Sequence, residues 1–180
     1  NTLDNYTVSV TNGRLTITPY AGEVILTANS ASGTYSGVTQ TVSGFEASGL
    51  LGSDSASSMS GYSASGSGKN AGTYASTFSG SNTNANYSNV KTVEGSLKIG
   101  KATLTVTGNT TSATYNGSEQ TNTYTVSGLV NNETASGAGL SVSGQASATN
   151  VSQGTVTDAL TANTLDNYTV SVTNGRLTIT

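Results

Sequence analysis

The stretch NTLDNYTVSVTNGRLTIT occurs twice in this chain, at residues 1–18 and again at residues 163–180. An identical stretch of this length indicates tandem duplication. In the first copy, apolar and polar side chains alternate on both sides of Asn12-Gly13, the apolar ones being Tyr6, Val8, Val10, Leu15 and Ile17. Alternation with a period of two around Asn-Gly predicts a β-hairpin. Its two-residue turn would place Val10 opposite Leu15 and Val8 opposite Ile17, so that one face of the ribbon is apolar.

The composition indicates a folded chain with thin cores. Hydrophobic residues make up 33% of the sequence, and the formal net charge is −3. Disorder by composition combines few hydrophobic residues with a high net charge, and this chain lacks the high charge. The 22 glycines, together with abundant Ser, Thr and Asn, fit short strands joined by tight turns. No stretch keeps a period of 3.6 residues, which excludes long helices.

The sequence lacks the residues that most enzymes and metal sites use. It contains no His and no Cys, so histidine bases, thiol nucleophiles and thiolate ligands are unavailable. Its nine carboxylates are scattered, and none follows a calcium-loop spacing. We therefore expect no enzymatic activity, no catalytic, cofactor-binding or metal-binding residues, and no cofactor.

The charge pattern also limits the partners. Charged residues make up 8% of the chain and form no basic patch, so neither nucleic acid nor an anionic membrane is an expected partner. No apolar run approaches the roughly 20 residues that span a bilayer, so membrane insertion is not expected.

Internal matches divide the chain into repeats of about eighty residues. GTYSGVTQ at 33–40 corresponds to ATYNGSEQ at 113–120, and the run from Asn86-Tyr87 to Ile99 corresponds to that from Asn167-Tyr168 to Ile179. We predict three segments: the closing hairpin of a preceding repeat at 1–18, a first β repeat domain at 19–100 and a second at 101–180. Because it begins within a repeat, we expect the chain to be a piece of a longer array.

One length difference between the repeats has a local consequence. The first repeat has one more residue after Asn86-Tyr87 than the second has after Asn167-Tyr168. In a hairpin around Glu94-Gly95, with Val90 opposite Ile99 and Thr92 opposite Leu97, an extra residue would turn Tyr87 away from the core. We predict a β-bulge at Ser88-Asn89 that returns Tyr87 to the core. The alternative is an exposed Tyr87.

Two further side-chain patterns suggest sites, and each has a simpler interpretation. The tyrosines could form a carbohydrate-binding surface, but four of them recur in the strand pattern, which favours core positions: Tyr6, Tyr87, Tyr115 and Tyr168. Lys101 and Asn174 lie near the two ends of the second repeat, a layout that resembles the Lys–Asn isopeptide bonds of Gram-positive pilins. Such a bond also needs a buried carboxylate, and the sequence identifies none. Asn174 is interpreted more simply as the first residue of a type I′ turn.

We expect an all-β protein of tandem, elongated small domains in a rod-like arrangement. Two folds remain open: an Ig-like sandwich, or a β-grasp-like sheet with a short helical turn near 45–51 and 129–135. The domains would connect strand to strand through 19–23 and 100–102. A lone two-stranded ribbon is only marginally stable in water. The hairpin at 1–18 should therefore pack either on the first repeat or on a neighbouring molecule.

Three motifs recur or stand out: the closing NYTVSVTNGRLTIT, the upstream Gly72-Thr73-Tyr74 and Gly154-Thr155, and the segment GLVNNET at 128–134. Together they resemble the motifs of the MBG family of glycine-rich, mostly-β repeats. The second repeat departs from the pattern at Val156, and the first lacks a clear acid–Thr pair.

This resemblance implies large bacterial surface proteins, in which such repeats lie between an anchored end and a binding end. The expected role is a stalk or spacer of a cell-surface adhesin, extracellular and anchored to the cell wall outside this fragment. Its partners would be neighbouring identical repeats. The alternative is an adhesive module that binds a glycan, a host protein or another copy of itself, as in biofilms.

Overall fold

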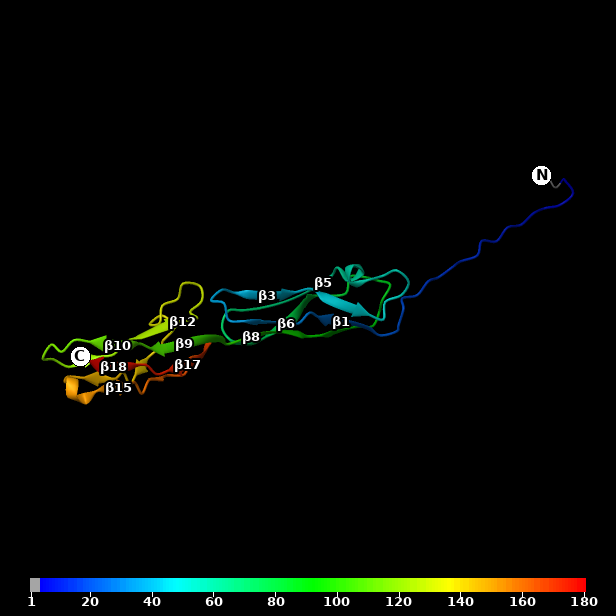
Figure 1. Ribbon diagram of the computed structural model, residues 1–180. Coiled ribbons are helices and arrows are strands. Elements are labelled where there is room, and N and C mark those ends of the chain that lie inside the picture. Colours follow the sequence, from blue (N-terminus) through cyan, green and yellow to red (C-terminus); the bar gives the residue numbers. More distant parts are fainter. Residues whose placement is uncertain (1–3) are drawn as a thin grey trace.

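The computed structural model describes residues 4–180. Residues 19–100 (the first repeat) and 101–180 (the second repeat) follow each other as a rod, and residues 4–18 project from one end (Figure 1). The repeats are almost entirely β, as predicted, with two short 3₁₀ helices, η1 (Ala56–Met59) and η2 (Val151–Gln153). Within the described part of the chain, no helix is long and apolar enough to cross a membrane.

The first repeat contains a three-stranded sheet of order β4-β1-β7 and a five-stranded sheet of order β2-β8-β6-β5-β3. The strands are β1 (Val24–Ala28), β2 (Ala31–Thr34), β3 (Gln40–Ser43), β4 (Phe45–Ser48), β5 (Tyr62–Gly68), β6 (Gly72–Gly80), β7 (Val90–Val93) and β8 (Gly95–Gly100).

The second repeat has the same pairings divided among more sheets, namely β12-β9-β17, β10-β18-β15, β11-β14 and β13-β16. The strands are β9 (Ala102–Gly108), β10 (Thr110–Ala113), β11 (Gln120–Thr121), β12 (Tyr124–Ser127), β13 (Val142–Ser143), β14 (Ser147–Ala148), β15 (Thr155–Thr157), β16 (Thr161–Ala162), β17 (Tyr168–Thr173) and β18 (Arg176–Ile179).

Each repeat contains two parallel strand pairs, β1–β7 and β2–β8 in the first and β9–β17 and β10–β18 in the second. The paired residues always lie 66 residues apart: Val24 with Val90, Ala31 with Leu97, Ala102 with Tyr168, and Thr110 with Arg176. These parallel pairs depart from the purely antiparallel sheets of an Ig-like sandwich. The β-grasp-like alternative is not matched in full either. The helical turn expected near 45–51 is instead strand β4, and residues 129–135 form loop and turn.

The predicted hairpin is not formed in either repeat. β17 lies beside β9, and β18 lies between β10 and β15, so the two strands that flank Asn174-Gly175 pair with different partners. Neither residue has a positive φ, which rules out the type I′ turn. A Cβ on Gly175 would overlap the carbonyl oxygen of Asn109. This glycine therefore permits a close strand crossing, and long-range ladders replace the local ribbon.

In the first repeat, Val90 pairs with Val24 rather than with Ile99, which corrects the hairpin predicted around Glu94-Gly95. Tyr87 is buried as predicted, and the ladder is interrupted at Ser88-Asn89. Tyr87 forms a β-bridge with Tyr20, and the next pair is Val90 with Val24. Between these two pairs, Ser88 and Asn89 lie opposite the three residues Ala21–Glu23. The extra residue of this irregularity is thus on the β1 side.

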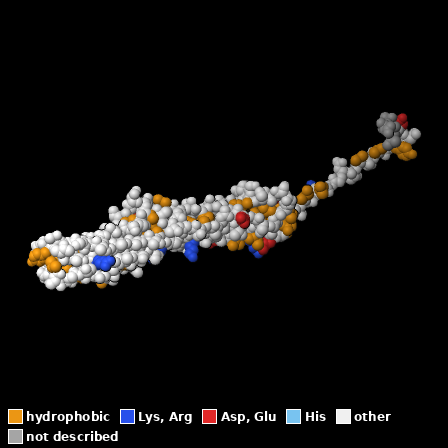
Figure 2. All heavy atoms as spheres, viewed as in Figure 1, with side chains coloured by type: hydrophobic (Ala, Val, Ile, Leu, Met, Phe, Trp, Pro, Cys, Tyr) orange, Lys and Arg blue, Asp and Glu red, His pale blue; other side chains and the backbone are white. Residues whose placement is uncertain are grey.

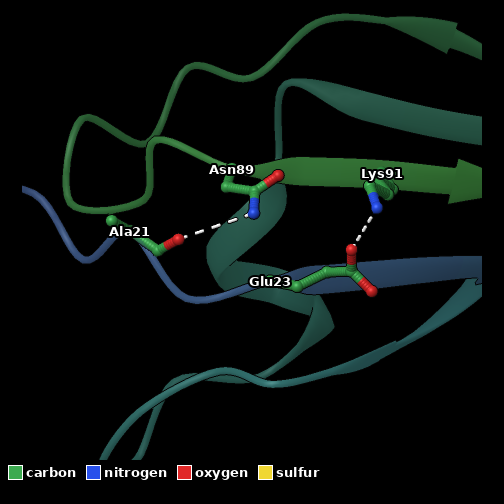
Figure 3. A network of polar contacts seen from close by, with 4 residues as sticks. All are labelled: Ala21, Glu23, Asn89 and Lys91. Atoms are coloured by element: carbon green, nitrogen blue, oxygen red, sulfur yellow. Dashed lines mark hydrogen bonds and ion pairs between the residues drawn. The ribbon is translucent and has the colours of Figure 1, made fainter.

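Side-chain contacts hold the start of β1 against β7. The Asn89 side-chain amide donates to the carbonyl oxygen of Ala21 at 3.5 Å, and Lys91 forms an ion pair with Glu23 (Figure 3). The two charged side chains are 63% and 42% exposed, and exposed pairs contribute about 0–1 kcal/mol. The contacts align the strand edge but add little stability.

Residues 4–18 form no strand and pack on neither repeat. Their apolar side chains are exposed, from 62% for Val8 to 85% for Leu15 and Ile17. The predicted hairpin and its packing on the first repeat are therefore wrong over this segment, and the part of the prediction on residues 1–3 lies outside the described residues. Packing on a neighbouring molecule stays a prediction, as does the division of the chain at 18/19 and 100/101.

Candidate functional site: the junction between the repeats

The two repeats are joined through a single residue. β8 ends at Gly100 and β9 begins at Ala102, so only Lys101 lies between them. The Lys101 ammonium donates to the carbonyl oxygen of Leu165 at 2.7 Å, and the Ala102 N–H donates to the carbonyl of Asn167 at 2.9 Å. This link was predicted at 100–102, and it leaves little chain to flex.

One hydrophobic core crosses the junction. Its buried members from the first repeat are Tyr35, Val42, Leu97 and Ile99, and those from the second are Ala102, Leu104, Leu165 and Tyr168. Burial of apolar surface contributes about 25 cal/mol per Å². Because residues of both repeats fill the same core, bending at Lys101 would expose it.

Glu133 connects tyrosines from the two repeats. The Tyr35 hydroxyl donates to Glu133 Oε1 at 2.5 Å, and the Tyr168 hydroxyl donates to Oε2 at 2.6 Å. The two rings meet edge to face, with centroids 5.4 Å apart, an arrangement that aromatic pairs favour. The Val130 N–H donates to the Tyr168 oxygen at 3.2 Å. Both carboxylate oxygens are thus used to fix one repeat against the other.

These contacts shift the pKa values in opposite directions. The hydrogen bond to Glu133, followed by burial, raises the pKa of Tyr35 to about 12. Burial and then the same carboxylate raise the pKa of Tyr168. The hydrogen bonds from Tyr168 and Tyr35 lower the pKa of Glu133 against the opposing effect of burial. The arrangement therefore favours neutral tyrosines and an ionised glutamate at neutral pH.

Amide contacts complete the junction. Asn167 Oδ1 accepts from the Ala71 N–H at 2.9 Å, and the Asn131 side-chain amide donates to the Gly37 carbonyl at 3.1 Å. Gly37 has a φ of 75°, and a Cβ there would overlap Asn131, so this loop needs glycine. Asn131 and Asn132 adopt left-handed φ values of 52° and 57°, which Asn tolerates better than most residues.

The first repeat carries an equivalent of the Glu133 site at its outer end. The Tyr87 hydroxyl donates to Asp54 Oδ2 at 2.6 Å and accepts from the Leu51 N–H at 3.0 Å. The hydrogen bond to Asp54 raises the pKa of Tyr87. Tyr20 meets the ring of Tyr87 edge to face, with centroids 6.1 Å apart.

Asp54 was not identified from the sequence as the counterpart of Glu133. The segment GLLGSDS at 49–55 corresponds to GLVNNET at 128–134. Gly49 and Gly128, with φ of 81° and 95°, approach equivalent backbone atoms of β1 and β9. Aligning these two glycines would have shown that Asp54-Ser55 corresponds to the acid–Thr pair of the second repeat.

A polar pocket of about 340 Å³ opens beside the junction. Tyr35, Glu133, Asn163, Asp166 and Asn167 contribute to its lining. Both tyrosine hydroxyls at this pocket already donate to Glu133. The pocket therefore presents amide and carboxylate groups, with the junction forming its wall.

The remaining sequence-based sites separate in space. Lys101 contacts Leu165, whereas the Asn174 side chain accepts from the Leu160 N–H at 2.8 Å. Ala102 pairs with Tyr168 and Thr107 with Thr173, so Lys101 and Asn174 lie near opposite ends of one ladder and cannot form an isopeptide bond. Among the tyrosines predicted as core, Tyr87 and Tyr168 are buried, but Tyr6 and Tyr115 are 76% and 53% exposed.

A buried carboxylate that the sequence did not indicate lies beside Asn174-Gly175. Asp158 is 3% exposed and accepts from the Ala146 N–H at 2.7 Å, the Gly175 N–H at 2.9 Å and the Asn122 amide at 3.0 Å. Burial alone would raise the pKa of Asp158, but these hydrogen bonds outweigh it and lower the pKa. Asp158 therefore stabilises the strand crossing at Gly175.

Comparison with known protein families supports the resemblance that the sequence motifs of the second repeat indicate. The family model of the MBG domain (YGX type) matches residues 104–178, which is less than half of the chain. No match was found among curated proteins or among solved structures. The resemblance drawn from the closing NYTVSVTNGRLTIT and GLVNNET is therefore confirmed for the second repeat, where residues 104–178 are similar to the MBG domain (YGX type).

Proposed function

We propose that this chain is a stalk or spacer segment of a bacterial cell-surface adhesin, which projects a distal binding domain away from the cell wall. The junction is the observation that carries this proposal. A one-residue link, a shared core and the Tyr35–Glu133–Tyr168 contacts hold successive repeats in one orientation. Repeats that contact mainly their neighbours give a rod whose length follows the repeat number.

The surface fits this role. Charged side chains are few and scattered over the visible face (Figure 2), and most of the exposed strand residues are Ser and Thr. Such a surface suits an extracellular spacer with neighbouring repeats as its partners. We propose no enzymatic activity and no nucleic-acid or membrane partner for it.

A second candidate function is direct adhesion, and the pocket beside Glu133 favours it. A cavity of about 340 Å³ lined by amides, carboxylates and tyrosines fits a monosaccharide-sized polar ligand. The occupied tyrosine hydroxyls weigh against it, since a ligand would have to compete with Glu133.

Solution scattering and binding measurements test the two together. We expect a rod-like scattering profile for the unmodified chain, and a broader distribution of inter-repeat angles for Tyr35→Phe combined with Glu133→Gln. Tyr124→Phe is the matched control, because Tyr124 lies in β12 and is not part of the core that crosses the junction. A flexible profile for the unmodified chain would contradict the stalk. Saturable glycan binding that Asn163→Ala abolishes would favour adhesion instead.

A further inference from the structure

Residues 4–18 have the sequence of a strand that is buried elsewhere in the same chain. Each residue from 4 to 18 is identical to the one 162 positions later, in 166–180. Leu15 and Ile17 are 85% exposed, whereas their twins Leu177 and Ile179 are 1% exposed. The segment therefore has the apolar pattern of a strand pair that is buried in the second repeat, but in this structure it is itself exposed.

The position of residues 166–180 in the second repeat can accept one extended segment. In the second repeat, β17 pairs with β9 over six residues, and β18 lies between β10 and β15. β17 and β18 are not paired with each other, so the stretch depends on no turn of its own. A segment of the same sequence from another molecule can make the same ladders.

The two ends of the rod carry counterparts of the groups that meet at the junction: the counterpart of Tyr35 at one end and that of Glu133 at the other. Tyr115-Asn116-Gly117, at the far end of the second repeat, corresponds to Tyr35-Ser36-Gly37, and the two glycines have φ of 79° and 75°. Apolar side chains gather at this end (Figure 2), and Tyr115 and Val151 are 53% and 55% exposed. At the opposite end, Asp54 is exposed, and Ser58 is the partner of its Oδ1.

We infer that this chain assembles head to tail with a second copy by strand exchange. Residues 4–18 of one copy take the place of residues 166–180 in the second repeat of the other. Thr18 is followed directly by Pro19-Tyr20, so the exchange brings the donor's first repeat to the far end of the receiving repeat. There Tyr115 of the receiving copy meets the exposed Asp54 of the donor, as Tyr35 meets Glu133 within one chain. The donor's Tyr20 already packs against its Tyr87.

The exchange loses no contact in the receiving repeat, because the incoming and displaced strands are identical. The displaced residues 166–180 become as exposed as residues 4–18 were. The net gain is the new junction, offset by the entropy of association. The contact joins different surfaces on the two copies and does not close, so it generates chains of any length.

The proposal rests on the same junction as the stalk function and can fail separately from it. It is tested by refolding the full chain from denaturant at high and at low concentration, followed by size exclusion with light scattering. Refolding is used because exchange requires the C-terminal strand to open. We expect multiples of 17.9 kDa that increase with concentration.

Two matched substitutions identify the exchanged segment. Leu15→Lys should lower the oligomer fraction at least tenfold, because its twin Leu177 is buried. Thr7→Lys should leave it unchanged, because its twin Thr169 is exposed. Both positions are exposed in the monomer, so neither change should affect its folding.

Tyr115→Ala tests the new junction between the two copies and should lower the oligomer fraction several-fold. A monomer at every concentration would overturn the proposal. So would oligomers that Leu15→Lys leaves unchanged, which would indicate reciprocal exchange of the C-terminal strands, or oligomers insensitive to Tyr115→Ala. A monomeric rod that binds no ligand would leave the stalk function intact.

Discussion

The Tyr35 hydroxyl of the first repeat donates to the Glu133 carboxylate of the second repeat at 2.5 Å, across 98 residues of sequence. Hydrogen bonds to charged groups contribute about 1.5–3 kcal/mol. The pair therefore couples the unfolding of one repeat to that of the other.

A double-mutant cycle measures this coupling. We expect Tyr35→Phe and Glu133→Gln each to lower the free energy of unfolding by about 1–3 kcal/mol, and the double variant to show a coupling of about 1 kcal/mol or more by chemical denaturation. Asp54→Asn serves as the control, since Asp54 contacts no residue of the second repeat through its side chain among the described hydrogen bonds. Additive effects of the two junction substitutions would contradict the coupling.

Alkaline pH should loosen the junction through Tyr35. The pKa of Tyr35 is raised to about 12 in the folded chain, against about 10 for an unperturbed tyrosine. The folded state thus holds this proton more tightly. The resulting stability is fully present below about pH 10 and is lost as the pH rises toward 12. The pH dependence of the unfolding midpoint should flatten over this range in Tyr35→Phe. An unchanged slope would exclude Tyr35 as its source.

Acid should remove the stabilisation of the fold that the ionised Glu133 and Asp158 provide. The pKa of each carboxyl is lowered in the folded chain. Their stabilisation is therefore present above the ordinary carboxyl pKa of about 4 and is lost as the pH falls through the lowered values. Unfolding followed between neutral pH and pH 2 should show this loss, and Glu133→Gln should reduce it. Stability that rises below pH 4 would reverse the sign and contradict the assignment.

Equivalent core positions should respond oppositely to alanine. Asp158 accepts three hydrogen-bond donors, whereas Ser76, its counterpart in the first repeat, is fully buried and has no side-chain partner among residues 4–180. Asp158→Ala leaves buried donors unpaired and should cost about 3 kcal/mol or more. Ser76→Ala removes an unpaired hydroxyl and should be neutral or stabilising by up to about 1 kcal/mol. Thermal unfolding of the two variants checks the contrast, which similar losses would refute.

Limited trypsin digestion compares one sequence in two environments. Arg14 and Arg176 lie within identical stretches, but Arg14 is in the exposed segment and Arg176 is in β18. Cleavage after Arg176 requires the second repeat to open, and the folded-to-unfolded ratio of small domains is roughly 10³ or more. Mass spectrometry should therefore detect cleavage after Arg14 first, by about that factor. Comparable rates at the two sites would show that β18 is not protected.

Several features could be predicted from the sequence because they depend on local pattern. Period-two alternation identified the strand character of 168–179, and internal repetition matched Tyr87 with Tyr168. Both tyrosines are buried as expected. The same alternation at Tyr115 led to a wrong prediction of burial, because Tyr115 lies in the loop between β10 and β11, outside the core clusters of the second repeat.

The sequence by itself determined the β class and the family resemblance, because these follow from side-chain periodicity and from short motifs. The tertiary structure alone decided the partners of NYTVSVTNGRLTIT. Asn-Gly suits a local turn, but in the second repeat the two flanking strands pair with β9, β10 and β15 instead. Those ladders bury Leu177 and Ile179, whereas an isolated ribbon leaves one face in water. Residues 4–18 have the same sequence as residues 166–180 but no partner strands, and they remain extended and exposed.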